Sequence, residues 1–137
     1  MKSLETLLKV ARRRMDELGV EAVRIGQHIE QLRMQEASIL AREESEVALA
    51  ASDPALGAIL PAYRARIKLQ AGEVRAETAE KEALLANVRG LLNAAYQEKS
   101  KFEQLLEQEA LRRSTERATR DQAALDEVAI NRVGFAK

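Results

Sequence analysis

Apolar residues in the first third of the chain recur at alternating steps of four and three. Between residues 4 and 43, twelve positions follow this rhythm and ten of them are apolar. A 3.5-residue period sustained over more than five heptads predicts a long helix in a left-handed coiled coil. We expect this helix to cover residues 3–51. The twelve positions are Leu4, Leu8, Ala11, Met15, Leu18, Ala22, Ile25, Ile29, Leu32, Glu36, Ile39 and Glu43.

A second series with the same rhythm lies between residues 67 and 106. Nine of its twelve positions are apolar. It predicts a second long helix, which we expect to cover residues 62–133. The twelve positions are Ile67, Ala71, Val74, Thr78, Lys81, Leu85, Val88, Leu92, Ala95, Lys99, Phe102 and Leu106.

The two series match when one of them is read backwards. Ile25 falls opposite Leu85, and this pair, like every other pair in the two series, has residue numbers that sum to 110. A constant sum is what an antiparallel hairpin requires. The midpoint, residue 55, lies in the one stretch where helix breakers gather, residues 52–61, which contains Pro54 and Pro61. We therefore predict an all-α antiparallel coiled-coil hairpin with a bend at 52–61.

The second helix is expected to extend past the start of the first. Residues 107–122 are almost entirely polar, and apolar residues return only over 123–130. A helix that is polar nearly all round is marginal by itself or bridges to another molecule. If helical over 107–133, the overhang is about 40 Å long. We expect its apolar end to need an external partner, and we treat residues 1–137 as one hairpin domain.

Composition agrees with a thin helical core. The chain has no Trp, two Phe and two Tyr, and 32% of its residues are charged. Lys and Arg together number 22, as do Asp and Glu, so no uniform attraction to nucleic acid or anionic lipid is expected. There is no Cys, which fits a reducing compartment, and no apolar run long enough to span a membrane. These features, with the charged N-terminus, predict a cytoplasmic protein without a transmembrane segment.

No catalytic or metal-binding constellation stands out in the sequence. His28 is the only histidine and has no Glu-x-x-His motif around it. There is no Gly-rich phosphate loop and no nucleophile elbow, and two thin helices offer no concave pocket that excludes water. We expect a protein that is not an enzyme, with no catalytic, cofactor-binding or metal-binding residues.

Charge is distributed unevenly along the expected hairpin. Residues 1–14 carry a net +4 and residues 112–120 a net +3, whereas residues 36–46 carry −3. These runs are either solvated helix faces or a basic end that docks on an acidic partner. Nucleic acid is a weaker option, because no aromatic residues are interleaved with the basic ones.

Gly19 and Gly26 lie one heptad apart beside the first series. Each glycine costs up to about 1 kcal/mol in a helix interior. They mark a close helix contact, deliberate flexibility, or simply tolerated surface glycine.

Two stretches carry a resemblance to a known family. They are residues 4–11, Leu-Glu-Thr-Leu-Leu-Lys-Val-Ala, and residues 121–129, Asp-Gln-Ala-Ala-Leu-Asp-Glu-Val-Ala. Together they resemble the FliJ family of the bacterial flagellar type III export apparatus. Its members have an N-terminal leucine-rich helix and a C-terminal pattern of Asp/Glu-Gln, a spacer, then hydrophobic-Asp-Glu-x-Ala. The likeness in length and hairpin layout extends over essentially the whole chain.

The resemblance implies a stalk similar to the gamma subunit of rotary ATPases. The joined terminal helices of such a stalk enter the hexameric flagellar export ATPase, and the middle and tip of the hairpin contact the export gate protein FlhA. Other export chaperones are further implied partners, and the implied location is the cytoplasmic face of the flagellar basal body. Toward the ATPase the resemblance places Leu4, Leu7, Leu8, Asp121, Gln122, Asp126 and Glu127, and the apolar overhang adds Leu125 and Val128. Toward the gate it places Gln35, Ile39, Tyr63 and Ile67.

The two lines of reasoning make competing claims on Ile39 and Ile67, because both are also positions of the helix–helix seam. The alternative function is a generic coiled-coil adaptor or chaperone, including the analogous stalk protein of a virulence type III secretion system. The stalk subunit of a proton-pumping rotary ATPase fits less well, because such subunits ordinarily carry a globular portion between their helices, and here only ten residues separate the two.

Overall fold

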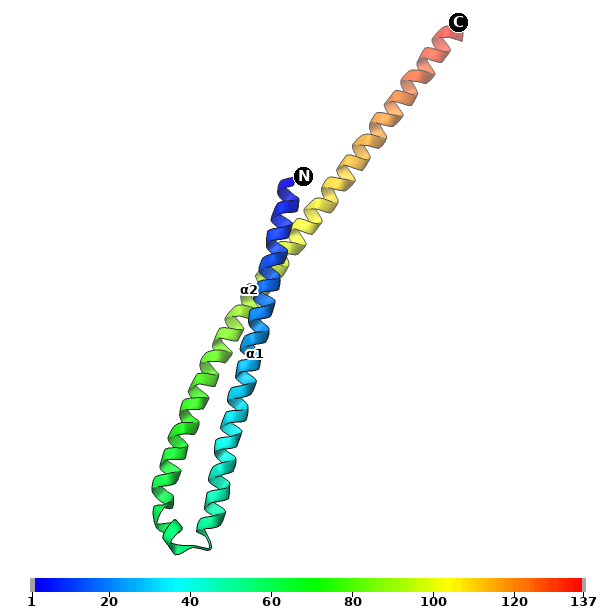
Figure 1. Cartoon of the computed structure of the whole chain (residues 1–137). Coiled ribbons are helices and arrows are strands. Elements are labelled where there is room, and N and C mark those ends of the chain that lie inside the picture. Colours follow the sequence, from blue (N-terminus) through cyan, green and yellow to red (C-terminus); the bar gives the residue numbers. More distant parts are fainter. Residues whose placement is uncertain (1, 137) are drawn as a thin grey trace. The chain divides into compact units, whose positions relative to one another are not determined.

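The computed structural model describes residues 2–136, with side chains described for residues 2–134. It contains two helices, α1 (Lys2–Ala50) and α2 (Pro54–Ala136), which run in opposite directions and contact each other (Figure 1). No strand occurs within this described range. The predicted all-α helical hairpin is confirmed.

The contacts divide the chain into two units, which we describe separately. One unit is Asp16–Asn93, and it contains the tip of the hairpin. The other joins residues 2–15 of α1 to residues 94–136 of α2.

Burial follows the predicted seam. All twenty-four positions of the two heptad series are buried or half-buried. Conversely, each of the thirteen buried residues of the described range belongs to one of the two series. A two-helix coiled coil buries one narrow stripe from each helix, so the 3.5-residue period accounts for the whole core.

In the unit Asp16–Asn93, the core consists of two buried clusters. One contains Ile39 and Ala71, a predicted facing pair, and the other contains Ile25 and Leu85, another such pair. Thr78 is the one buried polar residue among those described, and its hydroxyl donates to the carbonyl of Val74 over 2.9 Å. That bond satisfies the hydroxyl, which removes most of the penalty for burying it.

In the second unit, the first turns of α1 pack on α2 through Leu8, Ala11 and Ala95, whose exposed fractions are 7, 3 and 2%. Leu4 and Leu106, the outermost predicted pair, are half-buried. The hairpin seam therefore ends where the sequence series end.

The connection between the helices is shorter than predicted. Only residues 51–53 lie outside the helices, and α2 begins at Pro54 and includes Pro61, so the bend expected over 52–61 is wrong in extent. Asp53 caps α2, because the Ala55 N–H donates to its Oδ1 over 3.0 Å. Proline suits the first helical position, where its missing N–H has no intrahelical acceptor to lose.

Pro61 lies inside α2, in its second turn. The ring of a helical proline conflicts with the carbonyl four residues earlier, which here belongs to Gly57. This part of α2 packs at the hairpin tip: Leu56, Leu60 and Tyr63 are half-buried. They continue the seam at steps of four and three, so burial of their side chains opposes the cost of the proline.

One of the three interpretations of Gly19 and Gly26 is decided by the space around these residues. A Cβ built at Gly19 or Gly26 meets nothing within 4 Å. A close helix contact at these positions is therefore excluded. Both glycines lie in the interior of a regular helix.

Candidate partner-binding surfaces

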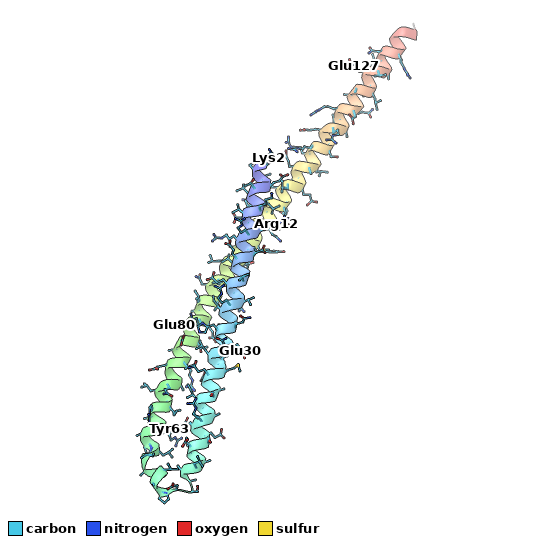
Figure 2. All side chains as sticks on the ribbon, in the orientation of Figure 1. Lys2, Arg12, Glu30, Tyr63, Glu80 and Glu127 are labelled. Atoms are coloured by element: carbon cyan, nitrogen blue, oxygen red, sulfur yellow. The ribbon has the colours of Figure 1, made fainter. Side chains whose placement is uncertain are left out.

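The part of α2 beyond Leu106 is an exposed surface that no other helix of its unit covers. We call residues 107–136 the C-terminal arm. From Ala110 to Gly134 every side chain is exposed. The seam does not continue along it, since the next positions in the rhythm are Glu109, Arg113, Glu116 and Arg120. Figure 2 shows Glu127 on this arm.

Four large apolar side chains gather near the end of the arm. Leu125 is 65% exposed and Val128 is 54% exposed, and Ile130 and Val133 are also exposed. Asp126 lies among them and accepts a hydrogen bond from Nε2 of Gln122 over 3.1 Å. The predicted residues Asp121, Gln122, Leu125, Asp126, Glu127 and Val128 are therefore all accessible on one segment.

The three predicted leucines of α1 differ in accessibility. Leu7 is 46% exposed, Leu4 is half-buried, and Leu8 is 7% exposed. The side chain of Leu8 packs in the helix–helix seam, so it supports the local structure and does not present a surface to a partner. Leu7 is the leucine of this group that reaches solvent.

Charge pairs at the base of the arm fix side chains at its surface. Arg112 donates from Nη2 to Oε1 of Glu109 over 2.8 Å and from Nη1 to Oε1 of Glu116 over 3.2 Å. The hydrogen bond from Arg112 lowers the pKa of Glu109, and burial opposes that shift only in part. The same bond raises the pKa of Arg112. These i,i+3 and i,i+4 pairs favour the helical state of a segment that has no other helix beside it.

The predicted gate-side residues do not form one surface. Ile39 and Ile67 are 7% and 5% exposed and belong to one buried cluster, against which Tyr63 packs. Their seam role, anticipated from the register, holds. Gln35 is exposed.

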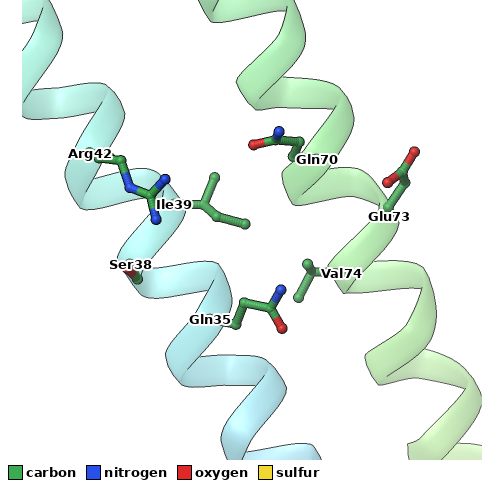
Figure 3. A pocket seen from close by; sticks show the side chains of 7 residues that line it. All are labelled: Gln35, Ser38, Ile39, Arg42, Gln70, Glu73 and Val74. Atoms are coloured by element: carbon green, nitrogen blue, oxygen red, sulfur yellow. The ribbon is translucent and has the colours of Figure 1, made fainter.

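Two grooves lie near these residues. Gln35 and Ile39 line a groove of ≈ 410 Å³ whose other walls are mostly polar, as Figure 3 shows with Arg42, Gln70 and Glu73 around Ile39 and Val74. A second groove of ≈ 300 Å³ lies at the hairpin tip. Tyr63 lines this groove. Figure 2 labels Tyr63 on α2. The tip groove is the more apolar of the two; its lining includes Ala50, Leu56, Ile59, Leu60 and Ala62.

The tip groove was not predicted from the sequence, because the helix breakers at residues 52–61 indicate a bend there. A signal was present, since the steps from Leu56 to Leu60 to Tyr63 to Ile67 continue the second heptad series toward the N-terminus. Ile59 is 61% exposed beside this groove. The apolar tip thus adds Leu56, Ile59 and Leu60 to the candidate surface around Tyr63.

Among residues 2–136 there is no group of three or more His, Cys, Asp or Glu side chains placed to hold a metal ion. Nε2 of His28 lies 3.9 Å from Oε1 of Glu77 across the seam. No helix in the described part of the chain is long and apolar enough to cross a membrane.

Comparisons with protein-family models, with curated proteins and with solved structures found no match.

Proposed function

We propose that this protein is a stalk component of the flagellar type III export apparatus, as its resemblance to the FliJ family implies. In this role it binds the hexameric export ATPase, favours assembly of the ATPase ring and couples the ring to the export gate protein FlhA. It acts without catalysing a reaction, at the cytoplasmic face of the flagellar basal body.

One observation carries the proposal: a helical hairpin extends one of its helices into an arm with exposed apolar residues. Leu125 and Val128 have no covering side chains in their unit, and they lie within the stretch 121–129 that carries the resemblance. Burial of apolar area is the main favourable term in association. The basic residues of the second unit, such as Arg13 and Arg117, suit an acidic docking surface.

The contact with the export gate is the second part of the proposal. The burial of two of the predicted contact residues limits the surface that can make this contact. Because Ile39 and Ile67 are buried in the seam, we assign the gate contact to the tip groove around Tyr63, with Leu56 and Ile59 beside it. Gln35 lies by the separate polar groove.

Binding to the ATPase tests the proposal through the double variant Leu125→Asp with Val128→Asp. Charge at these positions opposes burial of the arm, so we expect weaker binding and less ring formation. The helicity and melting of the hairpin should stay close to those of the parent, because neither side chain contacts the seam. The matched control is Leu69→Asp, since Leu69 is 67% exposed and lies on α2 outside the arm.

Undiminished binding of the double variant contradicts docking through the arm. Loss of binding by the control as well as the double variant indicates a nonspecific effect of added charge. The identity of the bound partner distinguishes the alternative function, which is a stalk of a virulence secretion system or a general adaptor. If the alternative function holds, the immobilised protein retains the ATPase of a virulence system, or no secretion ATPase, in place of the flagellar one.

A further inference from the structure

The C-terminal arm carries a second heptad stripe, on a face different from the one that continues the seam. Leu111, Ala118 and Leu125 are spaced by seven residues, with Thr115 and Gln122 between them and Ala129 four residues beyond Leu125. Leu111 is 68% exposed and Leu125 is 65% exposed. Apolar residues repeated every seven positions are the pattern by which one helix packs along another. No other helix of the unit covers this stripe.

The arm is also divided into two blocks of opposite charge. Residues 112–120 carry a net +3, from four arginines and Glu116, and residues 121–127 carry −3, from three carboxylates and no basic residue. The sign changes between Arg120 and Asp121, near the middle of the arm. An antiparallel copy of the same arm places each positive block beside a negative one, whereas a parallel copy places like charges together.

The stripe and the charges select one register. With Arg120 near the two-fold axis, facing residues have numbers that sum to 240. Leu111 then faces Ala129 of the second copy, and Ala118 faces Gln122 of the second copy. Beside the stripe, Arg112 lies by Asp126 of the second copy, and symmetry makes this pair occur twice. Such flanking charges set orientation and register in coiled coils.

The length of the arm is compatible with this arrangement. In the register that sums to 240, residue 107 faces residue 133 of the second copy. The α1 helix ends its seam at Leu4, which pairs with Leu106. Antiparallel arms therefore overlap along the segment that α1 leaves exposed, and the seam of each hairpin is preserved.

We propose that two copies of this chain associate through their C-terminal arms in antiparallel orientation, with Arg112 of each copy paired to Asp126 of the other. The apolar stripe, the charge blocks and the length of arm that α1 leaves uncovered support this proposal. The proposal does not depend on the export function. It makes the arm a surface that a second copy and any other arm-binding partner compete for.

Sedimentation velocity of the pure full-length protein over a concentration series is the first measurement. We expect a reversible shift from one chain to two at micromolar to millimolar concentration, because a stripe with only four apolar side chains per arm, Leu111, Ala118, Leu125 and Ala129, is modest. Raising NaCl from about 0.05 M to about 0.5 M should weaken the dimer several-fold, since screening removes the attraction between the charge blocks. A protein that stays monomeric throughout overturns the proposal and leaves the stripe to a different partner.

Apolar and charge variants locate the interface. Leu111→Asp should abolish dimerisation, whereas Leu69→Asp, at an equally exposed leucine outside the arm, should leave it unchanged. Arg112→Glu and Asp126→Arg should each weaken self-association about tenfold, because each reverses two facing pairs. Mixing these two variants should restore association, since both facing pairs in the mixed dimer are again of opposite charge.

Circular dichroism of each variant separates loss of the interface from loss of the arm helix, because Arg112 also pairs with Glu109 and Glu116 within its own chain. A mixture that associates no better than either variant alone overturns the proposed register. Equal weakening by Leu69→Asp and Leu111→Asp shows that the contact lies outside the arm.

Orientation is tested with introduced thiols, which is straightforward in a chain without cysteine. A mixture of Leu111→Cys and Ala129→Cys proteins should form disulfide-linked heterodimers faster than either variant links to itself. Rapid self-linking of Leu111→Cys alone indicates parallel arms and overturns the antiparallel arrangement.

Discussion

Arg75 of α2 donates a hydrogen bond from Nε to Oε1 of Glu36 of α1, which joins the two helices across the seam. Glu36 occupies a seam position, and its side chain is 22% exposed, whereas that of Arg75 is 61% exposed. The related pair of Arg64 and Glu43, 3.3 Å apart, lies nearer the tip. Each carboxylate that interrupts the apolar series is thus matched by an arginine on the opposite helix.

Replacing the seam carboxylate should stabilise the hairpin. We expect Glu36→Leu to raise the free energy of unfolding by about 1 kcal/mol, because an apolar side chain gains burial and the exposed Arg75 stays hydrated. Arg75→Ala should lower it by less than about 1 kcal/mol, as for other exposed ion pairs. Urea denaturation measures both changes. If Glu36→Leu lowers the free energy of unfolding, the ion pair with Arg75 contributes more to stability than burial of an apolar side chain at this position.

The antiparallel register can be checked with a pair of thiols. In the double variant Leu18→Cys with Leu92→Cys, the new side chains face each other in the seam of the unit Asp16–Asn93. We expect a disulfide within one chain, seen as faster migration on a non-reducing gel. Linkage mainly between chains contradicts the hairpin and indicates a swapped dimer.

Truncation of a seam residue should cost far more than truncation of an exposed one. Ile29 is 5% exposed within a buried cluster, so Ile29→Ala should lower the free energy of unfolding by roughly 2 kcal/mol, the low end of the range for core truncations, because a two-helix core is thin. Leu69→Ala is the control, since Leu69 is 67% exposed. Its cost should stay within about 0.5 kcal/mol. Equal losses at the two sites mean that the seam is assigned to the wrong face.

Replacing either glycine of α1 by alanine should raise the free energy of unfolding. A Cβ at Gly19 or Gly26 meets no neighbouring atom within 4 Å, and both residues lie inside α1. We expect Gly26→Ala to raise the free energy of unfolding by about 0.5–1 kcal/mol, because glycine loses more backbone entropy in a helix. Thermal melting of Gly19→Ala and Gly26→Ala gives the comparison. If a stabilised Gly26→Ala protein also loses binding to its partner, flexibility at this position serves the function.

The carboxyl group of Glu109 should titrate below its ordinary range. Arg112 donates to this carboxylate, which lowers the pKa of Glu109. A carboxyl whose pKa is lowered by folding stabilises the folded state above its ordinary pKa, and this contribution disappears as the pH falls through the lowered pKa. Carboxyl chemical shifts measured by NMR across acid pH give the pKa directly. In Arg112→Gln it should return toward the ordinary value, and high salt should reduce the shift in the parent.

The heptad seam was predictable because it depends on one local quantity, the spacing of apolar residues. A helix that buries a stripe must place an apolar residue every 3.5 positions, and two antiparallel stripes must have a constant sum of residue numbers. The overhang followed from the same reasoning, because residues beyond Leu106 have no counterpart on the first helix. Exposure of Leu125 and Val128 was predictable for this reason.

The turn was not predictable from residue types alone. Two prolines and a glycine within ten residues indicate a break, but they do not say which of them the helix tolerates. The structure places Pro54 at the first helical position, capped by Asp53, and retains Pro61 inside α2. The packing of Leu60 and Tyr63 at the tip decides this, and such contacts between distant residues are absent from any single local pattern.

The sequence by itself determined the fold class, the register of the helices and the segment of α2 that lacks a covering helix, because each of these depends on periodicity and length. Only the tertiary structure decided between seam packing and partner contact for the residues that both lines of reasoning claimed. Leu8, Ile39 and Ile67 are buried in the seam, whereas Leu7 reaches solvent. Accessibility depends on what lies opposite a side chain across the seam, and the identity of the side chain does not specify that.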